Sequence, residues 1–196
     1  MMALGVVAAL VLVLFWKFVL LGQIPTNADW LQHYSPWKSL GFPPQLPHNP
    51  EIGDSISQSY PFRAYTAESL KNGVVPLWNP YIFAGNPYLA NGQSAVFDSF
   101  GLVFLIFTPP VAFGVLLMLQ LFTTGLLMYL FLKALGVVRP AALLGAIALA
   151  FNGFFLTWLE NTVFVASALW TPLIFLLLHR LRQTGRWSYA LWCAFP

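Results

Sequence analysis

The chain has 196 residues, of which 59% are hydrophobic, 17% aromatic and only 8% charged. Nine Lys and Arg against six Asp and Glu give a formal net charge of +3, and the mean hydropathy is +0.73. Soluble domains are normally about one quarter charged, and nucleic-acid-binding domains cluster their cations. The composition therefore excludes a soluble domain, a disordered segment and a nucleic-acid partner, and it indicates a membrane protein.

The first apolar run covers residues 3–22 and contains one charge, Lys17. Twenty helical residues rise about 30 Å, which matches the hydrocarbon thickness of a bilayer. A signal peptide is the alternative, but it would begin with basic residues and have a shorter apolar core. We therefore predict a first membrane-spanning helix here.

A large polar loop follows at residues 23–98, where most of the acids and prolines lie. Residues 26–40 are predicted to be an interfacial segment with aromatic anchors, and residues 41–50 to be extended and proline-rich. Residues 51–72 are predicted to be helical in two pieces. Turn-forming pairs interleaved with aromatic residues at 73–98 indicate a compact ordered loop.

The rest of the chain is a series of apolar runs. Residues 99–108 are too short to span and end at two prolines, which favours an interfacial or re-entrant segment. The pair Asn152-Gly153 inside a later run indicates close helix packing. We predict full spans at 111–132, 141–158 and 162–178, and a partial span at 187–196 that suggests the N-terminal part of a longer protein.

Short-loop charges predict the orientation. The loops 133–140 and 179–186 are basic, whereas the turn 159–161 carries only Glu160. Basic loops face the cytoplasm, so the N-terminus is predicted to be cytoplasmic and residues 23–98 extracytoplasmic. The fold class is therefore predicted as all-α: one polytopic transmembrane helical bundle with a large first outer loop that contains short helices.

Asp54 is the first candidate for chemistry, because it is a carboxylate predicted at the outer membrane surface, one helical turn before Gln58. It could act as a base or hold a cation. The alternative is that it caps a helix beginning at Ser55. The three histidines match no metal-binding spacing, and the sequence has no phosphate-binding glycine motif.

Five further charged residues have open interpretations. Asp98 lies where the loop meets the apolar run and suits a helix cap. Glu160 lies at a membrane interface, where an acid can serve either function or structure. Arg63 could bind a phosphate at the outer surface together with Lys38 and Lys71, or all three could be solvated cations.

Two stretches of the loop, GDSISQSYPF (53–62) and LKNGVVPLWNPYIFAGNPYLANGQSAVF (70–97), resemble the YfhO-like bacterial membrane proteins. The family pattern has an Asp, a Gln and Pro-Phe, then Gly-x-x-Pro-Leu-Trp-Asn-Pro, Gly-x-Pro and a Gln before an aromatic residue. The chain departs from it at 97–99, Phe-Asp-Ser, where an aromatic-Pro pair is expected. The matching residues are Asp54, Gln58, Pro61, Phe62, Gly73, Pro76, Leu77, Trp78, Asn79, Pro80, Gly85, Pro87 and Gln93.

The resemblance implies a glycosyltransferase of the polytopic GT-C type in the bacterial cytoplasmic membrane. Such an enzyme takes a sugar from a polyprenyl-phosphate-linked donor, a membrane lipid, and gives it to an envelope glycan or glycolipid on the outer face. Asp54 matches the catalytic acid of the first outer loop, and a divalent cation, Mg²⁺ or Mn²⁺, could accompany it. Substrate contacts are expected from Gln58, Arg63, Trp78, Asn79, Tyr81, Gln93 and Glu160.

Two alternatives come from other functional classes. A transporter or flippase of lipid-linked sugars would be expected to carry charged or broken helices near the membrane midplane. A non-catalytic envelope assembly protein would use the outer loop as a docking surface. Substitution of Asp54 separates the enzyme from both alternatives.

Overall fold

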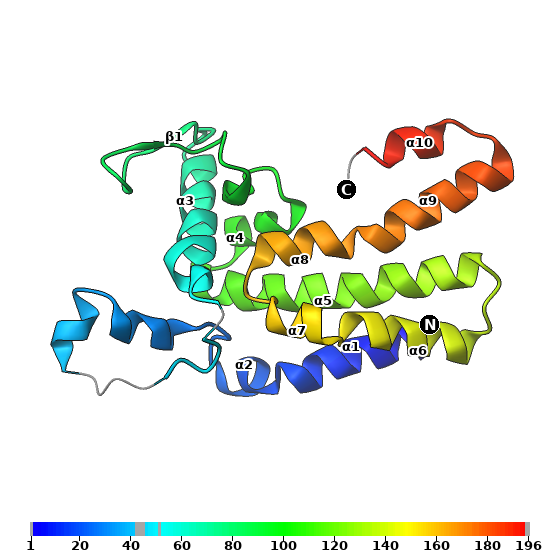
Figure 1. Ribbon diagram of the computed structural model, residues 1–196, viewed down its shortest axis with the longest axis horizontal. Helices are drawn as coiled ribbons and strands as arrows, with labels where there is room; N and C mark the ends of the chain where they lie inside the picture. The colour runs from blue at the N-terminus through cyan, green and yellow to red at the C-terminus, as the bar shows by residue number, and fades with distance from the viewer. Residues whose placement is uncertain (1, 42–45, 51, 195–196) are drawn as a thin grey trace. The chain divides into compact units, whose positions relative to one another are not determined.

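The computed structural model describes residues 2–41, 46–50 and 52–194, which form two compact units (Figure 1). The helix unit comprises residues 1–21, 118–159 and 164–196. The loop unit comprises residues 22–117 and 160–163. Both units are mainly helical, so the prediction of a mainly α-helical protein is confirmed.

Three helical segments are long and apolar enough to cross a membrane: Pro109–Ala134, Arg139–Thr157 and Thr162–Thr184. They contain the predicted spans at 111–132 and 162–178, and all but the last residue of the predicted span at 141–158. This length and hydropathy are those of a membrane protein. The segments comprise α5 (Pro109–Ala134), α6 (Arg139–Ala150), α7 (Gly153–Thr157), α8 (Thr162–Leu169) and α9 (Thr171–Thr184).

The first apolar run differs from the single helix expected over 3–22. It forms α1 (Met2–Leu14) and α2 (Trp16–Leu21), divided at Phe15. The hydrogen-bond ladder nevertheless continues across the division, because the Phe15 N–H donates to the Val11 carbonyl at 3.0 Å and the Val19 N–H donates to the Phe15 carbonyl at 3.0 Å. The longer piece has 13 residues and rises only about 20 Å.

A second division separates α6 from α7. The Asn152 side chain accepts a hydrogen bond from the Phe155 N–H at 2.9 Å and so begins α7. The expectation of close helix packing at this pair is wrong, because nothing lies within 4 Å of a Cβ added at Gly153. Asn152 is a cap, and a cap restarts the helix after a break.

Close packing in the helix unit occurs elsewhere, at small residues. Ala142, Ala146 and Ala150 recur every four residues along α6 and are fully buried. A Cβ at Gly125 of α5 would lie 2.8 Å from the Val7 side chain of α1. Small residues let helices approach closely, and Figure 1 shows α1 and α6 side by side. The unit ends in α10 (Ser188–Trp192), within the predicted partial span.

The loop unit is built from short elements around one longer helix. The predicted helical stretch 51–72 is in two pieces, as expected: a π-helical turn, η3 (Ser55–Ser59), and α3 (Tyr60–Lys71). Pro61 lies in the first turn of α3, and Gly73 follows its end with φ of +72°. The other elements are η1 (Ala28–His33), η2 (Trp37–Leu40), β1 (Trp78–Asn79), β2 (Asn86–Pro87), η4 (Gly92–Ser94), η5 (Ser99–Leu102) and α4 (Val103–Ile106).

A small core holds α3 against the loop that follows it. Phe62, Tyr88 and Val96 are buried together. The Tyr88 hydroxyl donates to the Phe62 carbonyl at 2.6 Å and lies 2.8 Å from the Thr66 hydroxyl. Burial raises the pKa of Tyr88 to about 12. Residues 73–98 are therefore an ordered loop, and the segment 99–108 forms only the short helices η5 and α4.

Candidate functional site

Asp54 begins the helical segment of the loop unit and is exposed to solvent. It has helical backbone angles, and its side chain makes no capping hydrogen bond. Its carboxylate is therefore not used as the helix cap that was the structural alternative. An exposed carboxylate at the start of a helix can contact a ligand without first breaking a capping hydrogen bond.

Glu160 lies at the same end of this segment, although it is far away in sequence. The Asn27 backbone N–H donates to Glu160 Oε2 at 2.7 Å. The Asn27 side-chain amide donates to the Ile52 carbonyl at 2.7 Å, two residues before Asp54. Asn27 therefore connects the chain around Glu160 to the start of η3, so the structure brings these two predicted site acids to one end of the loop unit.

The environment of Glu160 favours its protonated form. Burial raises the pKa of Glu160, and the nearby Asp29 carboxylate raises it further, whereas the Asn27 N–H and the Ser55 hydroxyl act in the opposite direction. Ser55 is fully buried and follows Asp54 directly. A carboxyl group whose pKa is raised by burial is suited to holding and releasing a proton nearer to neutral pH. This end of the loop unit thus combines one exposed and one half-buried acid.

Two glutamines of the motif meet next to this end. The Gln58 side-chain amide donates to the Gln93 side-chain oxygen. Gln93 lies in η4, where its N–H is held by the Asn91 side chain at 3.0 Å. The contact ties η4 to the turn that follows Asp54. Gln58 and Gln93 were predicted as substrate contacts, and the structure brings them together beside Asp54.

Trp78 and Asn79 have structural roles in a hairpin. Trp78 pairs with Pro87, and Asn79 pairs with Asn86, in an antiparallel register. The Asn79 side chain is buried and accepts a hydrogen bond from the Tyr81 N–H at 2.9 Å. The hairpin therefore gives Trp78 and Asn79 of the Pro-Leu-Trp-Asn-Pro block a structural role.

Gly85 completes the same hairpin. A Cβ at Gly85 would lie 2.6 Å from the Trp78 indole nitrogen, and its φ of +112° is one that L side chains rarely adopt. The Trp78 ring therefore lies directly across the glycine backbone, which no other residue would allow without movement. Trp78 keeps about half of its surface exposed (52%).

The aromatic residues of the hairpin do not lie beside Asp54. The Tyr65 hydroxyl donates to the Trp78 carbonyl at 2.7 Å, and the rings of Tyr65 and Tyr81 meet edge to face with centroids 5.6 Å apart. Along the helical segment, the rise from Asp54 to Tyr65 is roughly 15 Å. Trp78 and Tyr81 are therefore placed further along α3 and could contact only a remote part of a ligand held at Asp54.

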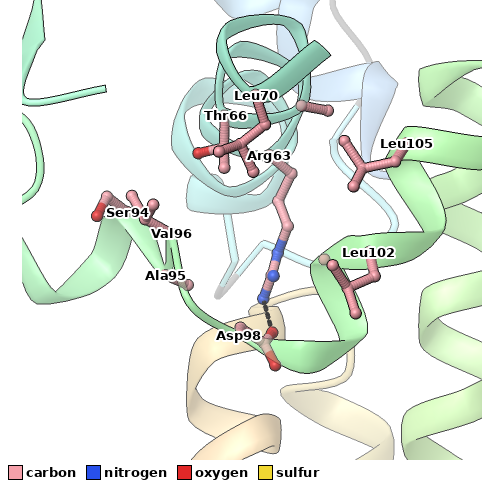
Figure 2. A pocket seen from close by; sticks show the side chains of 11 residues that line it. Arg63, Thr66, Leu70, Ser94, Ala95, Val96, Asp98, Leu102 and Leu105 are labelled. Atoms are coloured by element: carbon pink, nitrogen blue, oxygen red, sulfur yellow. Dashed lines mark ion pairs between the residues drawn. The ribbon is translucent and has the colours of Figure 1, made fainter. Parts of the chain in front are cut away.

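Arg63 is buried and paired, which differs from the expectation of an exposed phosphate-binding cation. Its Nη2 lies 2.5 Å from Oδ2 of Asp98, and it also donates to the Thr162 hydroxyl at 3.2 Å (Figure 2). Only 3% of Arg63 is exposed. Asp98 also accepts from the Phe100 N–H at 3.1 Å, which confirms the predicted cap.

The space next to Arg63 is too small for a phosphate ester. The hollow in Figure 2 holds about 20 Å³ and is lined by α3, η5 and the residues before η5. That volume admits about one water molecule. In the described part of the chain, Nη1 of Arg63 has no hydrogen-bond acceptor, so a water is the natural occupant. Arg63 therefore joins α3 to η5 and α8, and a direct contact with substrate phosphate is not supported.

Several of the site's supporting residues carried no signal in the sequence. Asn27, Ser55 and Thr162 are small polar residues at element boundaries, and such residues are common in turns of any function. Their role comes from contacts with residues up to 133 positions away. The Arg63–Asp98 pair also carried no signal, because no local spacing in the sequence joins these two residues.

Comparison of the chain with models of known families, with curated proteins and with solved structures found no match in any of the three. The resemblance to YfhO-like proteins therefore rests on the motif residues described above. In residues 2–41, 46–50 and 52–194, no three His, Cys, Asp or Glu side chains gather closely enough to hold a metal ion.

Proposed function

We propose that the protein is a membrane glycosyltransferase of the GT-C type. It would transfer a sugar from a polyprenyl-phosphate-linked donor to an envelope glycan or glycolipid on the extracytoplasmic face of the bacterial cytoplasmic membrane. The observation that supports it best is the location of the exposed Asp54 and the half-buried Glu160 at one end of the loop unit, beside Gln58 and Gln93. The motif had pointed to Asp54, Gln58 and Gln93, and the predicted interfacial position had pointed to Glu160.

The chemistry requires a base and a site for the departing phosphate. Asp54 would accept the proton of the acceptor hydroxyl as its oxygen bonds to the anomeric carbon. The bond between that carbon and the phosphate oxygen breaks, and the lipid phosphate leaves with the bonding electron pair. Asp54 would be the residue to hold a divalent cation, Mg²⁺ or Mn²⁺, and such a cation would supply positive charge next to the departing phosphate.

The remaining residues would have positioning roles. Gln58 and Gln93 can donate and accept hydrogen bonds with sugar hydroxyls. Trp78 and Tyr81 expose ring surface on the hairpin, 52% and 77% respectively, and would contact a more distant sugar unit of the acceptor. Glu160 would hold the segment around Asn27 next to the start of η3 without contacting the reacting atoms.

A second candidate is a non-catalytic assembly protein that docks through the hairpin. The observation that favours it is the exposure of large apolar side chains there. Phe83 in the turn of the hairpin is 91% exposed, and Tyr81 next to it is 77% exposed; neighbouring exposed apolar side chains indicate an interaction surface, whereas scattered single ones do not. Docking would require these residues and not the acids.

The test is genetic and chemical. The gene would be deleted in its source organism and restored as wild type, Asp54→Asn or Glu68→Gln. Glu68 is an exposed acid on α3, so its variant is a matched control for loss of one carboxylate. Lipid-linked sugars and envelope glycans would then be compared by mass spectrometry at equal protein abundance.

The proposal expects Asp54→Asn to behave like the deletion, with one sugar lost from a glycan and its lipid-linked donor accumulating. Glu68→Gln should restore the wild-type profile. Unchanged glycans and donors in the deletion would reject the transferase. A defect caused by Phe83→Ser but not by Asp54→Asn would favour docking.

A further inference from the structure

A second hollow lies in the helix unit, and none of the residues assigned to the candidate functional site lines it. It has a volume of about 690 Å³ and lies between α1, the end of α5 and the start of α6. Ligand-binding hollows in proteins have volumes of about 300–1,000 Å³, so this hollow is large enough for a small molecule. It is lined by Ala3, Val6, Tyr129, Lys133, Arg139, Pro140 and Leu143.

The lining divides into an apolar part and a basic part. Val6 and Leu143 contribute hydrocarbon surface, whereas Lys133 and Arg139 contribute two cations. Lys133 is half-buried, and its ammonium donates to the Val137 carbonyl at 2.7 Å, which leaves further N–H donors. Arg139 is exposed as the first residue of α6. The hollow therefore suits an amphiphile with a negative end.

The charges of the helix unit have no internal compensation. Its range contains six cations and none of the six Asp and Glu residues of the chain, all of which fall in the loop unit. The two cations of the hollow thus have no carboxylate partner within their own unit. An anion from outside the helix unit would neutralise the charges of Lys133 and Arg139. The six cations are Lys17, Lys133, Arg139, Arg180, Arg182 and Arg186.

The depth of the hollow follows from the helices that form it. α5 and the segment Arg139–Thr157 are both long and apolar enough to span, and the turn 135–138 joins them. Lys133 and Arg139 flank this turn, so in a bilayer they lie at the level of lipid head groups. Tyr129 and Leu143 lie about one helical turn deeper, where acyl chains begin.

We propose that this hollow binds an anionic glycerophospholipid of the membrane, with its phosphate between Lys133 and Arg139 and its glycerol and first acyl carbons against Val6 and Leu143. Basic hollows between spanning helices are suited to anionic lipid head groups. A free phosphate would use the cations but not the apolar wall, and a zwitterionic lipid would use the wall with less gain from the cations. This site is independent of the proposed transferase chemistry.

The experiment uses the purified 196-residue chain in a non-ionic detergent. Dioleoylphosphatidylglycerol, dioleoylphosphatidylcholine and glycerol 3-phosphate are each titrated, and bound ligand is measured by native mass spectrometry. The variant Lys133→Gln/Arg139→Gln is compared with Arg180→Gln/Arg182→Gln, which removes the same charge from residues that do not line the hollow. Val6→Trp, at an exposed position of α1, fills the hollow with its charges intact.

Phosphatidylglycerol should bind more tightly than phosphatidylcholine, and glycerol 3-phosphate should not compete. Each cation near a lipid phosphate contributes roughly fivefold, so Lys133→Gln/Arg139→Gln should weaken binding about 25-fold. The α9 control should stay within about twofold of wild type, and Val6→Trp should bind poorly. The melting temperature without lipid shows whether each variant is folded. If the Lys133→Gln/Arg139→Gln variant is not folded, the single variant Arg139→Gln replaces it.

Three results would overturn the proposal. Equal losses in the two double variants would mean that only general positive charge attracts the lipid. Equal binding of phosphatidylcholine would reduce the site to an apolar groove. Competition by glycerol 3-phosphate with undiminished binding to Val6→Trp would assign the cations to a soluble phosphate ester.

Discussion

At the scale of single residues, the titration of the Glu160 carboxyl group provides a test of the geometry of the candidate site. Its carboxylate accepts the Asn27 N–H at 2.7 Å, and burial raises its pKa above the usual 4.5. In the pH range just above 4.5 the folded protein therefore holds more protons than the unfolded chain does. The free energy of unfolding must then fall as pH rises through this range.

The variant Glu160→Gln should lose this pH dependence. Its amide oxygen can still accept the Asn27 hydrogen bond, but the side chain no longer titrates. We expect wild-type stability in detergent to decline as pH rises above about 4.5, with a flatter profile for Glu160→Gln. Chemical unfolding at a series of pH values measures this.

Asp29 provides the control, because its pKa is shifted in the opposite direction, so its contribution to stability changes with pH in the opposite way. Burial raises the pKa of Asp29, but hydrogen bonds from the His48 backbone and ring outweigh it, so the pKa is lowered from 3.8. Stability from Asp29 is present above pH 3.8 and is lost as pH falls through the lowered value. Asp29→Asn should keep most of the decline assigned to Glu160, because burial is the largest cause of the raised Glu160 pKa and the Asp29 charge adds to it only in part. If it removes that decline instead, the assignment is wrong.

Tyr88 is the second residue for which the structure defines a specific role, which is to hydrogen-bond inside the core of the loop unit. Its buried hydroxyl bonds to the Phe62 carbonyl and the Thr66 hydroxyl. Tyr88→Phe keeps the ring but leaves these partners unsatisfied, so the free energy of unfolding should fall by about 1–2 kcal/mol. Tyr81→Phe is the matched control, since Tyr81 is 77% exposed, and it should change stability by less than about 0.5 kcal/mol. Equal effects would show that the Tyr88 hydroxyl is not structurally used.

At the scale of elements, the hairpin of β1 and β2 depends on a glycine lying under a tryptophan. Gly85→Ala combines an unfavourable φ with a clash against the Trp78 ring, which we expect to cost about 2–4 kcal/mol of stability. In a Trp78→Ala background the clash is absent. The same Gly85→Ala change should then cost only about 1–2 kcal/mol.

Two other glycines calibrate this double-mutant cycle. Gly73 has φ of +72° with nothing within 4 Å of an added Cβ, so Gly73→Ala reports the backbone cost alone. Gly92 has neither constraint, and Gly92→Ala should be near neutral. Unfolding of each purified variant measures the series. An unchanged cost of Gly85→Ala in both backgrounds would show that Trp78 does not restrict this position.

The elements that were predicted correctly are those with a local cause. Pro61 and Gly73 marked the ends of α3 because a proline suits a first helical turn and a glycine suits a left-handed residue after the last. The span at 111–132 followed from continuous hydropathy. The division at Asn152 was missed, although its cause is local: an Asn side chain that caps a new helix inside an apolar run was interpreted as a packing residue.

The candidate site was predictable only in part. The motif pointed to Asp54, Gln58 and Gln93, and the structure places them at one end of the loop unit. Arg63 was expected at the surface, because an Arg is almost never fully buried unless it is paired. Its burial depends on Asp98 and Thr162, which are 35 and 99 residues away, and only the folded chain brings such partners together.

At the scale of the whole molecule, the two units differ in charge. The helix unit has six cations and no acid, whereas the loop unit has three cations and all six acids. Cations in short loops are retained on the cytoplasmic side of a membrane, and acids have little influence. Lys133 lies in the last turn of α5, and Arg139 begins α6. Arg180 and Arg182 lie near the end of α9, and Arg186 follows it. The ends of α5 and α9 should therefore face the cytoplasm and the loop unit the outside.

Cysteine labelling in intact cells tests this orientation. The single natural thiol is first removed by Cys193→Ser, and one cysteine is then introduced by Gly92→Cys or by Gln183→Cys. Both positions are exposed, one in η4 and one in the last turn of α9. A membrane-impermeant maleimide should label the Gly92→Cys protein in intact cells. The Gln183→Cys protein should react only after permeabilisation. The reverse pattern would place the acids of the loop unit in the cytoplasm, where a lipid-linked donor presented on the outer face could not reach Asp54.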